Sequence, residues 1–205
     1  MLGMNRLPMF QNKFLRNVFL AAGALSLCHC AHDAAPANQS SDQSLPSAQG
    51  GGQIHARNQG YSLLYRLMSD ESDVNKILVI KDVDPALKDV ITQISTAASN
   101  AKEQLDDYQK QDGHSEFDVP DLPRAEQEAR DLEAKVDEKE LVFSSGKTFE
   151  LRLILTQLQA LRYGQQLCDA LIPMELDPPR KAMLTNLASQ LGQYHDRLID
   201  LIAPK

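Results

Sequence analysis

The feature that most constrains the fold is the spacing of apolar residues after residue 60. In five successive segments, apolar side chains recur every three or four residues, as they do on one face of an α-helix. No alternating segments joined by a hairpin turn interrupt this pattern. Aromatic residues make up only 5% of the chain, whereas sandwiches and barrels are rich in aromatic and β-branched residues. We therefore expect an all-α fold.

The apolar segments predict four long helices and one charged helix, with breaks at Pro- and Gly-containing sites. The long helices are expected over residues 61–81, 85–112, 147–174 and 181–202. Short connections predict that the first pair and the last pair are antiparallel. The connector between the pairs is long enough to return the third long helix parallel to the second. These features predict a four-helix bundle with ferritin-like up-down connectivity, in which one long crossover carries an extra surface helix.

The charged segment RAEQEARDLEAKVDEKE, residues 124–140, belongs to that extra helix, which we expect over 124–143. Its only apolar edge consists of Ala125, Ala129, Leu132, Val136 and Phe143. A helix with this much charge is expected on the outside of the fold, where most such runs are solvated surfaces. The alternative is that this helix, or a groove that it covers, binds another protein.

The N-terminal segment has the features of an export signal. Arg6, Lys13 and Arg16 precede the apolar residues 18–27, and no acidic residue occurs before Asp33. The apolar run matches the length of a signal-peptide core and is shorter than the ~20 residues that span a bilayer. We expect residues 1–27 to be a signal peptide of the lipoprotein type.

The segment resembles a bacterial lipoprotein leader at its cleavage site. Leu25-Ser26-Leu27-Cys28 resembles a lipobox, except that Leu27 stands where a small residue is usual, and Cys30 is a second candidate for the lipid. A lipid on either cysteine would anchor the chain to a membrane. Two alternatives are cleavage by ordinary signal peptidase near residues 31–37 and a metal site formed by Cys28, His29, Cys30 and His32. Zinc sites usually take paired ligands from two separated turns, which disfavours the metal.

Residues 28–60 predict a disordered tether between that site and the helical domain, residues 61–205. The tether is rich in Ser, Gln, Ala, Gly and Pro and contains few residues that could be buried. Without residues 1–27, the chain has 18 Lys and Arg against 28 Asp and Glu, a net charge of about −10. Because such an acidic surface repels phosphate groups, we expect no nucleic-acid partner.

The order of features resembles a family of exported bacterial proteins of unknown function with a ferritin-like four-helix domain. The resemblance covers roughly residues 61–203 and rests on Pro85-Ala86-Leu87-Lys88, the connector VPDLP, the step Ser145-Gly146-Lys147-Thr148-Phe149-Glu150, and His195. It implies an exported protein of the periplasm or outer membrane. The chain has Ala97-Ala98 and Leu161 where members of that family often carry Asp-His and a further His, and it contains no Glu-x-x-His. Di-iron proteins of ferritin-like fold need that motif on two helices.

Few residues in the helical region suggest chemistry. Glu71, Asp73 and His195 are the only candidate remnants of a metal site, and we favour a kinked polar turn for Glu71 and a single hydrogen bond for His195. Cys168 lies on an apolar face, which favours a small buried side chain over a catalytic thiol. We expect no cofactor and no enzymatic activity.

These features together predict a structural or protein-interaction role in the cell envelope, with a membrane anchor on the N-terminal Cys. The alternative from another class is a ferritin-like protein that binds a metal or cofactor. A third reading is an envelope inhibitor or chaperone.

Overall fold

The computed structural model describes residues 47–112 and 122–203, and every regular element in these ranges is a helix. The prediction of an all-α fold is therefore confirmed for this part of the chain. The α-helices are α1 (Ser47–Glu71), α2 (Pro85–Asp112), α3 (Arg124–Phe143), α4 (Gly146–Leu171) and α5 (Pro178–Ile202). Two 3-10 helices, η1 (Val74–Val79) and η2 (Ile172–Met174), follow α1 and α4.

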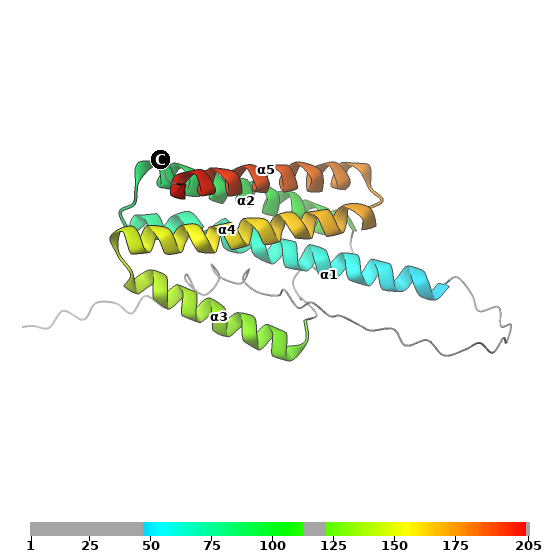
Figure 1. Cartoon of the computed structure of the whole chain (residues 1–205). Coiled ribbons are helices and arrows are strands. Elements are labelled where there is room, and N and C mark those ends of the chain that lie inside the picture. The colour runs from blue at the N-terminus through cyan, green and yellow to red at the C-terminus, as the bar shows by residue number, and fades with distance from the viewer. Residues whose placement is uncertain (1–46, 113–121, 204–205) are drawn as a thin grey trace, which may run out of the picture.

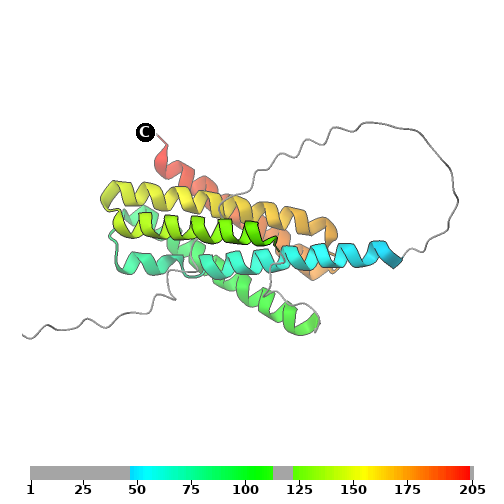
Figure 2. The same cartoon turned by 90° about the horizontal axis from the view of Figure 1, so that it is seen from below.

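The helices look nearly aligned in Figure 1, but Figure 2 shows that α2 and α5 cross α1 and α4 at an angle. Helices that follow one another in the chain run in opposite directions. Helices α2 and α4, which precede and follow α3 in the sequence, are therefore parallel to each other. Helix α4 packs against α5 and α1, and α2 packs against the same two helices. Helix α3 contacts α4 and lies on the outside, as expected for the charged segment (Figure 2).

The predicted helix starts and breaks are confirmed at three sites. The backbone N–H of Ala86 donates to Asp84 Oδ1 over 2.8 Å, and Pro85 is the first residue of α2. Asp177 accepts from the N–H of Arg180 in the same way at the start of α5. Gly146 begins α4 with φ of +57°, a conformation that a side chain disfavours, and so separates α3 from α4.

Helix α1 begins at Ser47, inside the segment 28–60 that we expected to be a tether. The later turns of this stretch pack on the folded body: a Cβ on Gly60 would lie 2.7 Å from Leu171 Cδ2, and Arg57 Nη1 lies 3.8 Å from Glu175 Oε1. Tertiary contacts of this kind stabilise a helix that its own sequence does not favour. The domain boundary at residue 60 therefore lies within a helix.

The helix predicted over 61–81 is broken after Glu71. The chain turns at Ser72 and continues as η1, and Ser95 of α2 donates from Oγ to the carbonyl of Ser72 over 2.6 Å. The polar patch of residues 69–73 thus interrupts the helix. The Ser72 carbonyl at the break thus has a partner on α2, and the N–H groups of Ser72 and Asp73 donate to the carbonyls of Met68 and Asp70.

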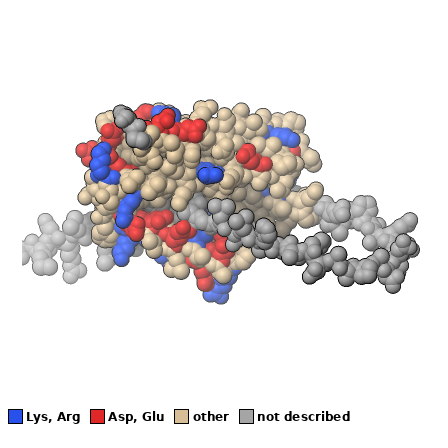
Figure 3. Space-filling model, viewed as in Figure 1, with Lys and Arg blue, Asp and Glu red and all other residues tan. Residues whose placement is uncertain are grey.

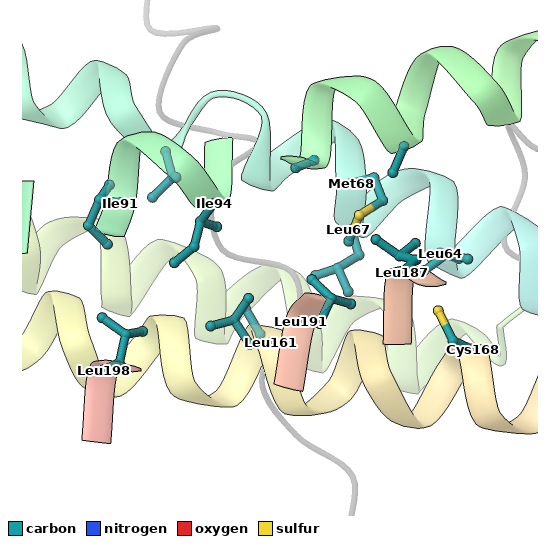
Figure 4. Packing of buried hydrophobic residues seen from close by; sticks show 14 of the residues in the cluster. Leu64, Leu67, Met68, Ile91, Ile94, Leu161, Cys168, Leu187, Leu191 and Leu198 are labelled. Carbon is teal, nitrogen blue, oxygen red and sulfur yellow. The ribbon is translucent and has the colours of Figure 1, made fainter. Parts of the chain in front are cut away.

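Apolar side chains from α1, α2, α4 and α5 form one core (Figure 4). Helix α4 contributes to it from two faces, including Phe149, Leu161 and Cys168. Leu151 and Leu155 of the same helix are about half exposed. The neighbouring helices leave these two side chains partly uncovered.

Gly164 of α4 lies where side chains of both α1 and α5 approach the α4 backbone closely. A Cβ at this position would lie 2.9 Å from Leu191 Cδ1 of α5 and 2.9 Å from Leu67 Cδ2 of α1. Both leucines are buried, so neither side chain can move into solvent. The absence of a side chain at Gly164 therefore sets the spacing of three helices.

We expect Gly164→Ala to destabilise the protein. Overpacking costs about 1–3 kcal/mol, and it outweighs the gain of about 1 kcal/mol that Ala brings within a helix. The matched control is Gly192→Ala, whose Cβ would only contact Gln165 Nε2 at 3.5 Å and which should stabilise by about 0.5–1 kcal/mol. Urea unfolding followed by circular dichroism measures both, and a Gly164→Ala variant as stable as Gly192→Ala would contradict the packing argument.

Candidate functional site

Two carboxylates are buried where α1 ends. Asp70 and Glu71 are 3% and 2% exposed, although acidic side chains are almost never fully buried unless paired. Glu71 accepts a hydrogen bond from the side chain of Gln157 on α4, which is also buried. Within the described part of the chain, Glu71 Oε2 and Gln157 Oε1 have no hydrogen-bond partner. A small polar site therefore lies between α1 and α4.

Asp70 points to a different place from Glu71. It borders a small pocket with room for about one water molecule, and its Oδ2 has no hydrogen-bond partner among the described residues. The pocket lies between α1, α3 and α4 and is lined by Leu63, Arg66, Leu67, Asp70, Leu122, Arg130 and Tyr163. The two consecutive carboxylates thus do not converge on one point.

Both carboxyl groups have pKa values far above their ordinary range. Burial raises the pKa of Glu71 from 4.5 to about 8, although the hydrogen bond from Gln157 acts in the opposite direction. Burial, and then the neighbouring charge of Glu71, raise the pKa of Asp70 from 3.8 to about 8, against the effect of Arg66. Both groups are therefore mainly protonated at neutral pH.

The three residues weighed as metal ligands do not form a cluster. Asp73 is ion-paired with Lys76 at 2.6 Å, and His195 Nδ1 lies 3.4 Å from Asp196 Oδ1 on α5. In residues 47–112 and 122–203, no group of three or more His, Cys, Asp or Glu side chains could hold a metal ion. Glu71 is the only one of the three that is buried in the core.

Cys168 is a buried core residue, as its position on an apolar face predicts. Its side chain is fully covered, and burial raises the pKa of the thiol to about 12. A thiol held in the neutral form is a poor nucleophile. Cys28 and Cys30, the candidates for lipidation, and the signal peptide 1–27 lie outside the described residues.

Glu175 anchors the turn between α4 and α5, a role that its sequence position did not indicate. It accepts a hydrogen bond from Tyr61 Oη at 2.6 Å and from the backbone N–H groups of Leu176 and Asp177. Burial acts to raise the pKa of Glu175, but these bonds and Arg57 together lower it. This carboxylate is charged and satisfied, so we assign it to the structure of the fold.

Helix α3 attaches to the rest of the protein mainly through polar contacts. Arg66 of α1 donates to Gln127 Oε1 at 3.3 Å, Arg130 donates to Tyr163 Oη at 3.3 Å, and Arg152 pairs with Glu140 at 2.8 Å. At its C-terminal end, Lys81 Nζ donates to the carbonyls of Val142 and Ser144. Only Ala134 and Leu141 are buried in the helix.

The apolar edge of α3, residues Ala125, Ala129, Leu132, Val136 and Phe143, faces solvent. The side chains of Leu132, Val136 and Phe143 are 63%, 55% and 78% exposed, and both alanines are exposed as well. Over α3, on the face shown in Figure 3, acidic side chains lie among basic and uncharged ones. Scattered exposed apolar residues are ordinary, but an aligned edge on one helix is typical of an interaction site. This edge is the strongest candidate site on the described surface.

No protein-family model, curated protein or solved structure matches the chain. None of the helices in the described ranges is long and apolar enough to cross a membrane.

Replacing Glu71 should change how stability depends on pH. The folded protein retains a proton on Glu71 that the unfolded chain has released, from about pH 4.5 up to about pH 8. The free energy of unfolding therefore falls as the pH rises through this window. Glu71→Gln keeps the shape but cannot ionise, so we expect a smaller fall and a variant more stable than the wild type at about pH 8.

Urea unfolding at a series of pH values measures this difference. The matched control is Glu103→Gln, which makes the same substitution on the exposed side of α2. If the curves for Glu71→Gln and the wild type ran parallel, the buried carboxyl group would not be protonated in the folded protein.

Proposed function

We propose that the chain is a non-enzymatic, exported protein of the cell envelope that binds another protein through α3. The single observation that carries the interaction is the exposed apolar edge of α3. A helix that is fastened by its polar side and leaves its apolar side in solvent is suited to an interaction in which that side is covered.

The proposal includes a membrane anchor. The basic and apolar residues 1–27, followed by Cys28 and Cys30, support export and lipidation at one of these cysteines. The protein would then work in the periplasm or at the outer membrane, held by its lipid at one end. Attachment at the N-terminal Cys would tether the helical domain to the membrane without making it part of the membrane.

We further propose that α1, α2, α4 and α5 form a four-helix bundle with ferritin-like connectivity. The antiparallel neighbours and the parallel pair α2 and α4 on either side of α3 support this architecture (Figure 1). The order and directions of the helices would also account for the resemblance to the exported family with a ferritin-like domain. In this arrangement α3 belongs to the crossover, and its position on the outside follows from the path of the chain.

A second candidate function is metal binding, and the buried site at Glu71 is the observation that favours it. The unpaired Oε2 of Glu71 is an oxygen that a cation could use, whereas the unpaired Oδ2 of Asp70 belongs to a residue that borders a separate pocket. However, the raised pKa of both groups keeps them protonated, and protons compete with metals for such ligands. The set also lacks the Glu-x-x-His motifs of di-iron bundles.

Photo-crosslinking in cells of the native host tests the first function. A crosslinking amino acid at Leu132 should join the chain to one protein in the membrane fraction. The matched control is Leu176, an equally apolar side chain that is 88% exposed away from α3, where no such adduct is expected.

The purified chain should carry a diacyl or triacyl mass on Cys28 or Cys30.

Equal labelling from both positions, or none from either, would contradict an interaction through α3. An unmodified mass in a soluble fraction would contradict the anchor.

Metal analysis of the purified protein tests the second function. The expected result is no stoichiometric iron, manganese or zinc after purification in buffers that contain these ions. Metal present in a 1:1 ratio with the chain, and lost in Glu71→Gln, would establish the metal-binding function in place of our assignment of Glu71 as a protonated core residue.

A further inference from the structure

We infer that the partner of α3 presents a basic amphipathic helix, which packs along the apolar edge as in a two-stranded coiled coil. This inference rests on the proposed function, because it names the kind of partner that the interaction would require.

The spacing of the apolar edge is that of a coiled-coil seam. Ala125, Ala129, Leu132 and Val136 alternate steps of four and three residues, and Phe143 follows Val136 by seven. This mean spacing of 3.5 residues keeps a seam on one side of a helix along its length, which for α3 is about 30 Å. Lys139 takes the remaining seam position and places one cation within an otherwise apolar edge.

The opposite side of α3 is already occupied. Gln127, Ala134 and Leu141 recur every seven residues, and they are the positions farthest from the seam in a heptad. Ala134 and Leu141 are buried against the body, and Gln127 accepts the hydrogen bond from Arg66. The body therefore holds α3 in the rotation that presents the seam to solvent, so a partner helix can pack there without moving α3.

Charges beside the seam determine which helix fits. The flanking positions hold Glu126, Glu133 and Glu140 on one side and Glu128 and Lys135 on the other. Acidic side chains thus outnumber basic ones by four to one at the positions that, in coiled coils, pair with the partner. Glu126, Glu128 and Glu140 already pair with Arg130, Arg124 and Arg152, but ion pairs on a surface are weak. A helix with Lys or Arg at its own flanking positions would compete for these three glutamates and pair with Glu133.

A second copy of the chain fits less well. In an antiparallel pair, the flank of Glu126, Glu133 and Glu140 would face the same flank of the other copy. In a parallel pair, the like charges of Glu128 and Glu133 would face each other, and only Lys135 would face an opposite charge, Glu140 of the other copy. Like charges at these positions disfavour association, which is how coiled coils reject unsuitable partners.

The seam and its flanks can be tested with two synthetic helical peptides and the purified full chain. The peptides share Leu at the seam positions and differ at the flanks, where one has Lys and the other Glu. By isothermal titration calorimetry we expect the Lys peptide to bind at least about tenfold more tightly than the Glu peptide, a difference of about 1.4 kcal/mol.

Two double variants test the contributions of the apolar seam and of the flanking charges to binding separately. Leu132→Gln combined with Val136→Gln should weaken binding of the Lys peptide at least about tenfold, whereas the matched control Leu176→Gln should not. Glu128→Lys combined with Glu133→Lys should reverse the preference in favour of the Glu peptide. Since all these side chains are exposed, circular dichroism should show unchanged unfolding midpoints.

Three results would overturn the inference. The first is equal binding of the two peptides, or binding of neither. The second is a dimer of the wild-type chain, seen by light scattering, that Leu132→Gln with Val136→Gln dissolves. The third is loss of binding to phosphatidylglycerol vesicles in the same double variant, which would make the edge a lipid contact. A specific crosslink at Leu132 with no peptide preference would leave the proposed interaction standing and reject only the basic helix.

Discussion

The close approach of α1 and α5 to α4 at Gly164 is the constraint on which the rest of the structure depends. Leu67 and Leu191 occupy the space that a side chain at Gly164 would need. This contact joins the first and last helices of the described chain to the same point of α4, far apart as they are in sequence. It makes α4 the helix around which the core is built, since α4 is covered from two sides.

The packing of α1 and α5 on α4 decides which surface remains for α3 to attach to. Once α1 and α5 occupy two sides of α4, the surface left for α3 offers mainly Arg66, Tyr163 and Arg152, and these bind the polar side of α3. Only Ala134 and Leu141 contribute apolar contacts. The apolar edge consequently points to solvent, with its acidic flanks, and this orientation links the packing of the core to the proposed partner.

Sequence reasoning located part of the buried polar site and missed the rest. A kinked polar turn at Glu71 was predicted within one helix over 61–81, whereas α1 ends at Glu71 and η1 follows. The burial of Asp70 was not predicted, because the acidic run around it is typical of an exposed turn. Gln157 could have been found, since it lies four residues from both Leu153 and Leu161 on the inward face of α4. Glu175 gave no signal, because its partner Tyr61 is distant in sequence.

The sequence by itself determined the helices, because the three- and four-residue spacing, Asp84-Pro85, Gly146 and Asp177-Pro178 act within a few residues of chain. It also determined that α3 has one apolar edge with acidic flanks. Only the tertiary structure decided which way that edge faces and how far α1 extends before Tyr61. Both depend on contacts between segments far apart in sequence, such as Arg66 with α3 and Gly60 with Leu171, and periodicity within one helix carries no information about such contacts.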